Sequence, residues 1–167
     1  MKEDHVDSIM GQWVDTYSDL DVSAMGIVSR ISRISRHIDQ KLQLIFSDFD
    51  LVAGEFDVLA TLRRSGQHYQ LTPTELFSAL MLSSGAMTNR LDRLEAAGLI
   101  ERHPNPDDRR GILVRLTEAG IELMDRAYPA HIANEEQLVV TLTTSERKIL
   151  SDLLRKLLLS FEGKEQE

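Results

Sequence analysis

A long stripe of apolar residues is the strongest pattern in the chain. Between residues 27 and 45, large aliphatic side chains recur at intervals of three and four, which predicts one face of a helix of about 25 residues. The stripe consists of Ile27, Ile31, Ile34, Ile38, Leu42 and Ile45. Charged residues such as Arg33, Arg36 and Lys41 fall off it. A helix with such a stripe often packs against a partner helix.

The C-terminal third predicts two more helices. Thr117 is expected to cap the first, in which Pro129 would introduce a kink. Thr143 and Glu146 form a capping box that opens the second. The apolar stripe of this last helix consists of Leu150, Leu153, Leu154, Leu157, Leu158 and Phe161.

Two short helices are predicted in the middle of the chain, after a helix over residues 54–62. Thr72 is an N-cap, Pro73 fits the first helical position and Glu75 completes a capping box, so one helix runs from here to about Leu80. The other opens after a gap of about three residues, at 83–84, and ends near residues 97–98. Its inward positions are Met87, Leu91 and Leu94. Two short helices joined by a tight turn indicate a helix-turn-helix.

A β-hairpin is predicted directly after these helices. Residues 99–102 and 112–116 are short apolar runs typical of strands. Between them, residues 103–111 contain two prolines and a glycine, which predicts a long, irregular, charged tip.

The expected fold class is therefore mainly α with a small β-hairpin wing. We predict a winged helix-turn-helix domain over 51–117, dimerisation helices over 23–50 and 118–167, and an N-terminal extension over 1–22. A monomer of this shape cannot bury both terminal stripes, which predicts a homodimer. Such a dimer would place two recognition helices on one face of DNA, about 34 Å apart for half-sites one turn apart.

The charge balance weakens a DNA-binding interpretation without excluding it. The net charge is −8, and residues 1–22 hold one lysine against six acidic residues. Residues 83–116, in contrast, hold six arginines against five acidic residues. The local field at the docking face matters more for DNA than the total.

Composition and motifs exclude several other classes. The chain has no cysteine, which removes disulfides and thiolate metal sites. No long apolar run indicates a membrane span, and no basic leader indicates a secretory signal. A cytoplasmic protein is therefore expected. Enzyme motifs are also absent, and no cofactor is expected. Among the histidines, only His131 has a potential co-ligand at helical spacing, Glu135, and two ligands are weak evidence for zinc.

Residues 83–117 resemble the recognition helix and wing of the MarR family of transcription regulators. The most specific pieces are Gly-Leu-Ile-Glu-Arg at 98–102 and Asp-Asp-Arg-Arg-Gly at 107–111. The resemblance extends from about Val22 to Phe161. It implies a dimeric regulator that binds a palindromic operator.

The resemblance and the helix pattern together suggest the DNA contacts. If the apolar positions of the second short helix face the core, its other face can reach bases and phosphates through Ser84, Thr88, Asn89 and Arg93. In the wing, the family pattern implies that Arg110 enters the minor groove, braced by Asp108, while Arg109 touches phosphate. The alternatives are a solvated polar helix face and a charged turn with incidental ion pairs.

A narrower resemblance, to the urate-responsive, pectinase-regulator-like branch, suggests an effector site. The matching positions are Trp13, Asp57, Arg90 and Arg102. A flat aromatic anion such as urate or another purine would stack on tryptophan and pair with a guanidinium. Alternatively, Trp13 anchors the extension, Asp57 and Arg102 form a permanent ion pair, and Arg90 contacts DNA.

The sequence thus predicts a ligand-responsive DNA-binding repressor that is not an enzyme. A winged-helix module that binds another protein and has lost DNA binding is the alternative, and the acidity of the chain is its best support.

Overall fold

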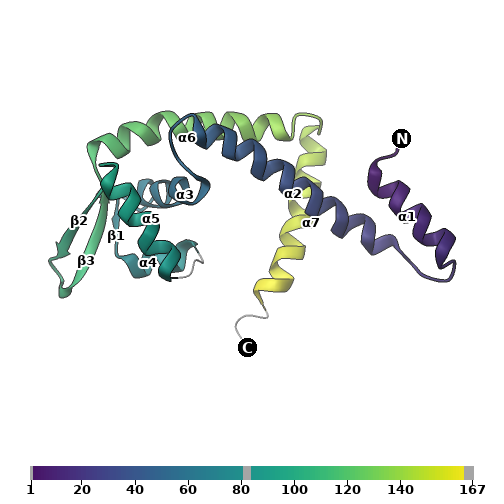
Figure 1. The fold of residues 1–167 in the computed structure, drawn as a ribbon, viewed down its shortest axis with the longest axis horizontal. Helices are drawn as coiled ribbons and strands as arrows, with labels where there is room; N and C mark the ends of the chain where they lie inside the picture. Colours follow the sequence, from purple (N-terminus) through teal and green to yellow (C-terminus); the bar gives the residue numbers. More distant parts are fainter. Residues whose placement is uncertain (1, 81–83, 164–167) are drawn as a thin grey trace. The chain divides into compact units, whose positions relative to one another are not determined.

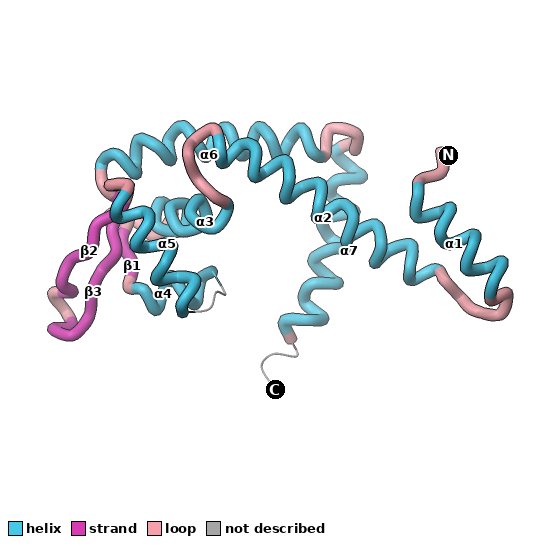
Figure 2. Tube along the Cα trace, in the orientation of Figure 1, coloured by secondary structure: helices cyan, strands magenta, loops and turns pink. Residues whose placement is uncertain are grey.

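The computed structural model describes residues 2–80 and 84–163, without the side chains of residues 84–86 and 109. The chain divides into two compact units, Met1–Phe56 and Asp57–Glu167. Figure 1 labels the elements of both units, and Figure 2 shows how the described part of the chain is divided among helix, strand and loop. We describe each unit by itself.

The first unit is built from two helices and the start of a third. Helix α1 (His5–Thr16) is followed by the 25-residue α2 (Ser23–Ser47), the length predicted from the aliphatic stripe. Helix α3 (Ala53–Arg63) begins after a turn in which Asp50 has a positive φ of 56°. Phe46 and Phe56 stack with ring centroids 4.4 Å apart, which closes this turn.

The second unit contains the predicted helix-turn-helix. After α3 come β1 (Gln70–Leu71), α4 (Pro73–Leu80) and α5 (Ser84–Ala96). The capping box is confirmed, because the Thr72 N–H donates to the Glu75 carboxylate at 2.7 Å and the Glu75 N–H to the Thr72 hydroxyl at 3.2 Å. Gly66 and Gly98, which follow α3 and α5, have positive φ values of 107° and 71°. Ser83 lies outside the described residues.

The β-sheet is antiparallel, with strand order β1-β3-β2. Strand β2 (Ile100–Asn105) pairs with β3 (Asp108–Leu116) from Ile100 opposite Leu116 to Asn105 opposite Asp108. The short β1, which our sequence analysis missed, pairs with β3 through Gln70 and Leu71. Two residues are too few to show an alternating pattern.

The prediction of an irregular tip over residues 103–111 was wrong. Strand pairing continues through Pro104, opposite Ile112, and the connection between the strands is only Pro106 and Asp107. Proline is tolerated because β2 is an edge strand in which a missing N–H need not remove a ladder bond. The pairing register of the two strands shifts between Pro104 and Asn105, as at a β-bulge.

The helices that follow the wing begin at the predicted caps. Thr117 caps α6 (Glu118–Leu138) by accepting the Gly120 N–H, and the helix continues through Pro129. Thr143 and Glu146 cap α7 (Thr144–Glu162) reciprocally. A Cβ on Gly120 would lie 2.1 Å from the Leu99 carbonyl oxygen, so glycine is required for the close approach of α6 to the start of the wing.

The core of the second unit lies between the helix-turn-helix, the sheet and α6. Its fully buried side chains include Leu59, Leu62, Leu76, Leu94, Ile100, Val114 and Met124. Helix α7 has no buried residue, and the six apolar side chains of its predicted stripe are 40–63% exposed in the single chain. Ile27, Ile31 and Ile34 of α2 are also exposed. Among the described helices, none has the combination of length and apolarity that crossing a membrane requires.

Candidate DNA interface and effector site

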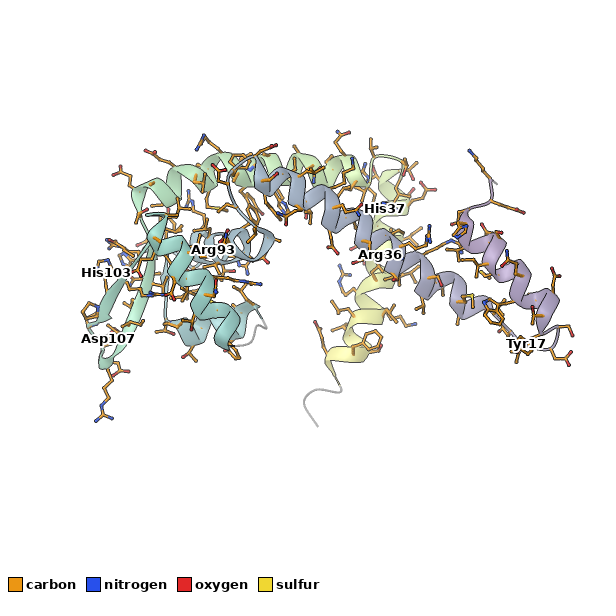
Figure 3. The ribbon with its side chains drawn as sticks, viewed as in Figure 1. Tyr17, Arg36, His37, Arg93, His103 and Asp107 are labelled. Carbon is orange, nitrogen blue, oxygen red and sulfur yellow. The ribbon has the colours of Figure 1, made fainter. Side chains whose placement is uncertain are left out.

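Helix α5 presents a polar face because its apolar residues are buried on the other side. Met87, Leu91 and Leu94 are at most 3% exposed, as predicted. Thr88, Asn89 and Arg93 are exposed, and Figure 3 labels Arg93 on this helix. The predicted contact Ser84 is the first residue of α5, and its side chain is not described. The exposed face provides hydroxyl, amide and guanidinium groups of the kinds that contact bases and phosphates.

The wing tip is held by two short-range hydrogen bonds. The Asn105 side-chain oxygen accepts the Asp107 N–H at 3.0 Å, and the Asp108 carboxylate accepts the Arg110 N–H at 2.9 Å. Asp108 therefore braces the backbone of Arg110, whereas the family pattern suggested only that it supports the arginine. The Arg110 side chain is exposed, and Figure 3 shows Asp107 at the tip of the hairpin. The Arg109 side chain is not described.

Arg102 joins the wing to the recognition helix. From strand β2, its guanidinium forms ion pairs with Glu95 at 2.6 Å and with Asp92 at 2.7 Å, both on α5. Its side chain is 25% exposed, so solvent screens these pairs only in part. A guanidinium that spans two carboxylates fixes orientation as well as charge. The base of the wing and helix α5 are thus linked.

The same arrangement neutralises acidic groups near the predicted DNA-binding face. Asp92 and Glu95 face Arg102, and Glu101 lies 2.8 Å from His103 Nε2 and 2.7 Å from an Arg115 nitrogen. The close contact of the His103 ring, followed by the hydrogen bond from Arg115, lowers the pKa of Glu101. Three of the five acidic residues between 83 and 116 therefore have cationic partners within this segment. The acidity of the whole chain is a poor guide to this region.

Asp57 lies in the second unit together with Arg90. Its side chain is exposed by surface area, yet the surrounding protein partly desolvates the carboxyl and raises its pKa, and the nearby Arg90, His131 and Arg64 oppose this increase only in part. The sequence singled out Asp57 and Arg90 but gave no sign that His131 is near them. His131 Nε2 lies 3.2 Å from Glu135, and the described residues contain no cluster of three potential metal ligands.

Of the four predicted effector residues, Trp13 belongs to the first unit, and Asp57, Arg90 and Arg102 belong to the second. Arg102 pairs with Asp92 and Glu95, which sequence reasoning missed, although their i, i+3 spacing places both on one face of α5. Trp13 belongs to the first unit, on α1, where it is 45% exposed and stacks on Tyr17 with centroids 5.8 Å apart. Asp57 and Arg90 are the two members that interact electrostatically.

We expect Asp57→Asn to raise the melting temperature at pH 7. Burial raises the pKa of this carboxyl in the folded state, so its ionisation disfavours folding once the pH exceeds the value in the unfolded chain. The gain should shrink as the pH falls toward 3.8, where the carboxyl is increasingly protonated in both states. Thermal melts of both proteins across this range measure the difference.

Asp125→Asn provides the matched control for this measurement. It removes the same charge but loses an ion pair of 2.8 Å to Arg63, so it should give no gain. A lower melting temperature for Asp57→Asn at pH 7 would mean that Arg90 stabilises the carboxylate by more than burial costs it.

Comparison with known proteins agrees with this architecture. A model of the MarR family matches residues 51–112. The transcriptional regulator PecS of Dickeya dadantii (strain 3937) is 40% identical over 149 residues, which cover 89% of this chain and 90% of PecS.

Solved structures give the same result. A cysteine-to-serine mutant of E. coli MarR complexed with operator DNA matches with a TM-score of 0.72 and 33% identity, over 84% of this chain and 99% of that one. Bordetella bronchiseptica BpsR, whose DNA binding is regulated by 6-hydroxynicotinic acid, matches with a TM-score of 0.69 and 26% identity, over 79% of this chain and 98% of BpsR. With its recognition helix, wing and relatives in agreement, the chain belongs to the MarR family of transcription regulators.

Proposed function

We propose that the chain is a homodimeric repressor that binds a palindromic operator and is released by a small aromatic anion. The observation that carries the DNA-binding part is the match, over 84% of this chain, to MarR complexed with operator DNA. The matched relatives are transcription regulators rather than enzymes. A protein that acts on operator DNA in a bacterium works in the cytoplasm.

DNA recognition is assigned to α5 and the wing. The recognition helix would enter the major groove with Ser84, Thr88 and Asn89 toward base edges, while Arg93 contacts the backbone. Arg110 would enter the minor groove, positioned by the bond from its N–H to Asp108, and Arg109 would contact phosphate. Because Arg102 links the wing to α5, a shift of one alters the placement of the other.

Dimerisation is assigned to α2 and α7. Their exposed aliphatic stripes are too extensive for a soluble monomer, in which large contiguous apolar patches are rare. A second copy can cover them by self-complementary contact around a two-fold axis. The same axis would relate the two recognition helices, and a palindromic operator has the matching symmetry.

The effector is assigned to Asp57, Arg90 and Arg102, with Trp13 providing a stacking surface. Arginine attracts a flat anion, and tryptophan adds an apolar ring face. Asp57 would repel the anion, and this repulsion provides a force that can move the DNA-binding elements. The similarity to PecS and the response of BpsR to an aromatic acid support an effector such as urate or another purine.

Removing Arg110 should weaken operator binding. We expect Arg110→Ala to lose about fivefold or more in affinity, since arginine contacts in the grooves contribute about 1–3 kcal/mol. Fluorescence anisotropy with DNA from upstream of the chain's own gene, at several salt concentrations, measures this loss. Arg126→Ala, which removes the same charge from the exposed surface of α6, is the control and should bind like wild type.

Two outcomes would overturn the DNA-binding assignment. If the affinity of Arg110→Ala for the operator is within twofold of wild type, the wing is not part of the DNA interface. Absence of a sequence-specific complex for the wild-type protein at low salt would favour a winged-helix module that binds another protein.

Urate should raise the melting temperature of the wild-type protein, because a ligand that binds only the folded state stabilises it. Trp13→Ala should abolish this increase by removing the stacking surface, while Trp13→Phe should keep part of it. Val14→Ala, a truncation at a residue equally exposed on the same helix, should leave it unchanged. An undiminished increase in Trp13→Ala, measured by thermal shift, would place the effector elsewhere.

A further inference from the structure

Arg30 of α2 forms ion pairs with Asp4 and Asp7 at the start of α1. Its Nε donates to one oxygen of Asp4 at 2.8 Å, and its Nη2 donates to the other at 3.1 Å. Nη2 also lies 2.7 Å from the Asp7 carboxylate. One guanidinium therefore connects two carboxylates that belong to the first turn of another helix, a geometry that lysine cannot reproduce.

The same two carboxylates organise the beginning of α1. Asp4 is the N-cap and accepts the Val6 and Asp7 N–H groups at 2.8 and 3.0 Å, while Asp7 accepts the Asp4 N–H at 2.9 Å. The hydrogen bond from Arg30 and those from the backbone lower the pKa of Asp4 to about 2. The helix start is thus assembled together with its attachment to α2.

Close packing between α1 and α2 is confined to the first half of α1. Val6 is 2% exposed, and a Cβ on Gly26 of α2 would lie 3.1 Å from the Met10 sulfur. Every residue from Gly11 to Leu20 is exposed in the single chain. Trp13 and Tyr17 stack on each other in this exposed half, and Figure 3 labels Tyr17 at the end of α1.

We propose that Arg30 is a positioning residue for the effector response, because its contacts with Asp4 and Asp7 fix the helix that presents Trp13. We call these three residues the α1 latch. Trp13 lies nine residues beyond Asp4, or about 14 Å along a helix at 1.5 Å per residue. At its other end, α1 is joined to α2 through segment 17–22, whose residues 17–21 are exposed.

The α1 latch lowers the free-energy cost of effector binding, because it keeps Trp13 in the position that binds the effector. A protein that adopts its binding-competent arrangement only part of the time binds its ligand more weakly by that fraction. If release of the latch leaves Trp13 in place about a tenth of the time, the apparent dissociation constant for the effector rises about tenfold. This role rests on the proposed function, whereas the latch itself can be tested without an effector.

The main test compares Arg30→Gln with Arg36→Gln in the full-length protein. Arg36 lies on the same helix and is labelled in Figure 3, and its only hydrogen bond among the described residues goes to the Ser32 carbonyl. Trp13 is the only tryptophan, so time-resolved fluorescence anisotropy reports on α1 directly. We expect faster local motion of Trp13 in Arg30→Gln and no change in Arg36→Gln.

Two further variants separate the latch from the helix cap. Asp4→Asn keeps a residue that caps helices well but removes the charge that pairs with Arg30. It should therefore also increase the local motion of Trp13. Arg30→Lys should restore part of the rigidity, because an ammonium can pair with one carboxylate at a time. Circular dichroism and operator binding should stay at wild-type levels in each variant, which rules out a general loss of folding.

The effector titration then tests the positioning role. In Arg30→Gln, the urate concentration that half-dissociates the operator complex should rise about tenfold, while operator affinity without urate is unchanged. Wild-type motion of Trp13 in Arg30→Gln would overturn the latch. A mobile Trp13 with an unchanged urate response would overturn its positioning role. Failure of urate to act on the wild-type protein would refute the proposed effector, while the anisotropy result still decides the latch.

Discussion

Apolar surface that one chain cannot bury is the constraint on which the account depends. Helix α7 has six aliphatic or aromatic side chains in one stripe and no buried residue, and α2 exposes Ile27, Ile31 and Ile34. Exposing so many large side chains to water is costly, at roughly 25 cal/mol for each Å² of apolar surface. In the proposed dimer, a second copy would remove this cost and set the spacing of the two DNA-binding units.

Within the second unit, a few short contacts connect the elements that carry the predicted DNA-binding residues. Arg102 connects β2 to Asp92 and Glu95 of α5, and Gly120 lets α6 approach the start of the wing. The contacts of Arg102 also pair two acidic side chains near the predicted DNA-binding face. A chain with a net charge of −8 can therefore belong to a family of DNA-binding regulators.

Local signals in the sequence predicted most of the fold. Capping by Thr72 and Thr143 and the burial of Leu91 depend on nearby residues, and the structure confirms them. The course of the wing through Pro104 was missed, because tolerance of proline depends on the strand being at the edge of the sheet. The partners of Arg102 and the setting of Asp57 arise from tertiary packing, which spacing along the chain does not reveal. The roles of the predicted site residues stay predictions.

The most direct test of the central claim is the mass and operator affinity of Leu154→Asp, measured by sedimentation equilibrium and fluorescence anisotropy. The account predicts that the wild-type protein is a dimer and that a carboxylate in the α7 stripe yields a folded monomer with severely weakened operator binding. Lys156→Asp, which alters charge on the same helix away from the stripe, should stay dimeric and bind DNA. A monomeric Leu154→Asp protein that binds the operator as tightly as wild type would contradict the account.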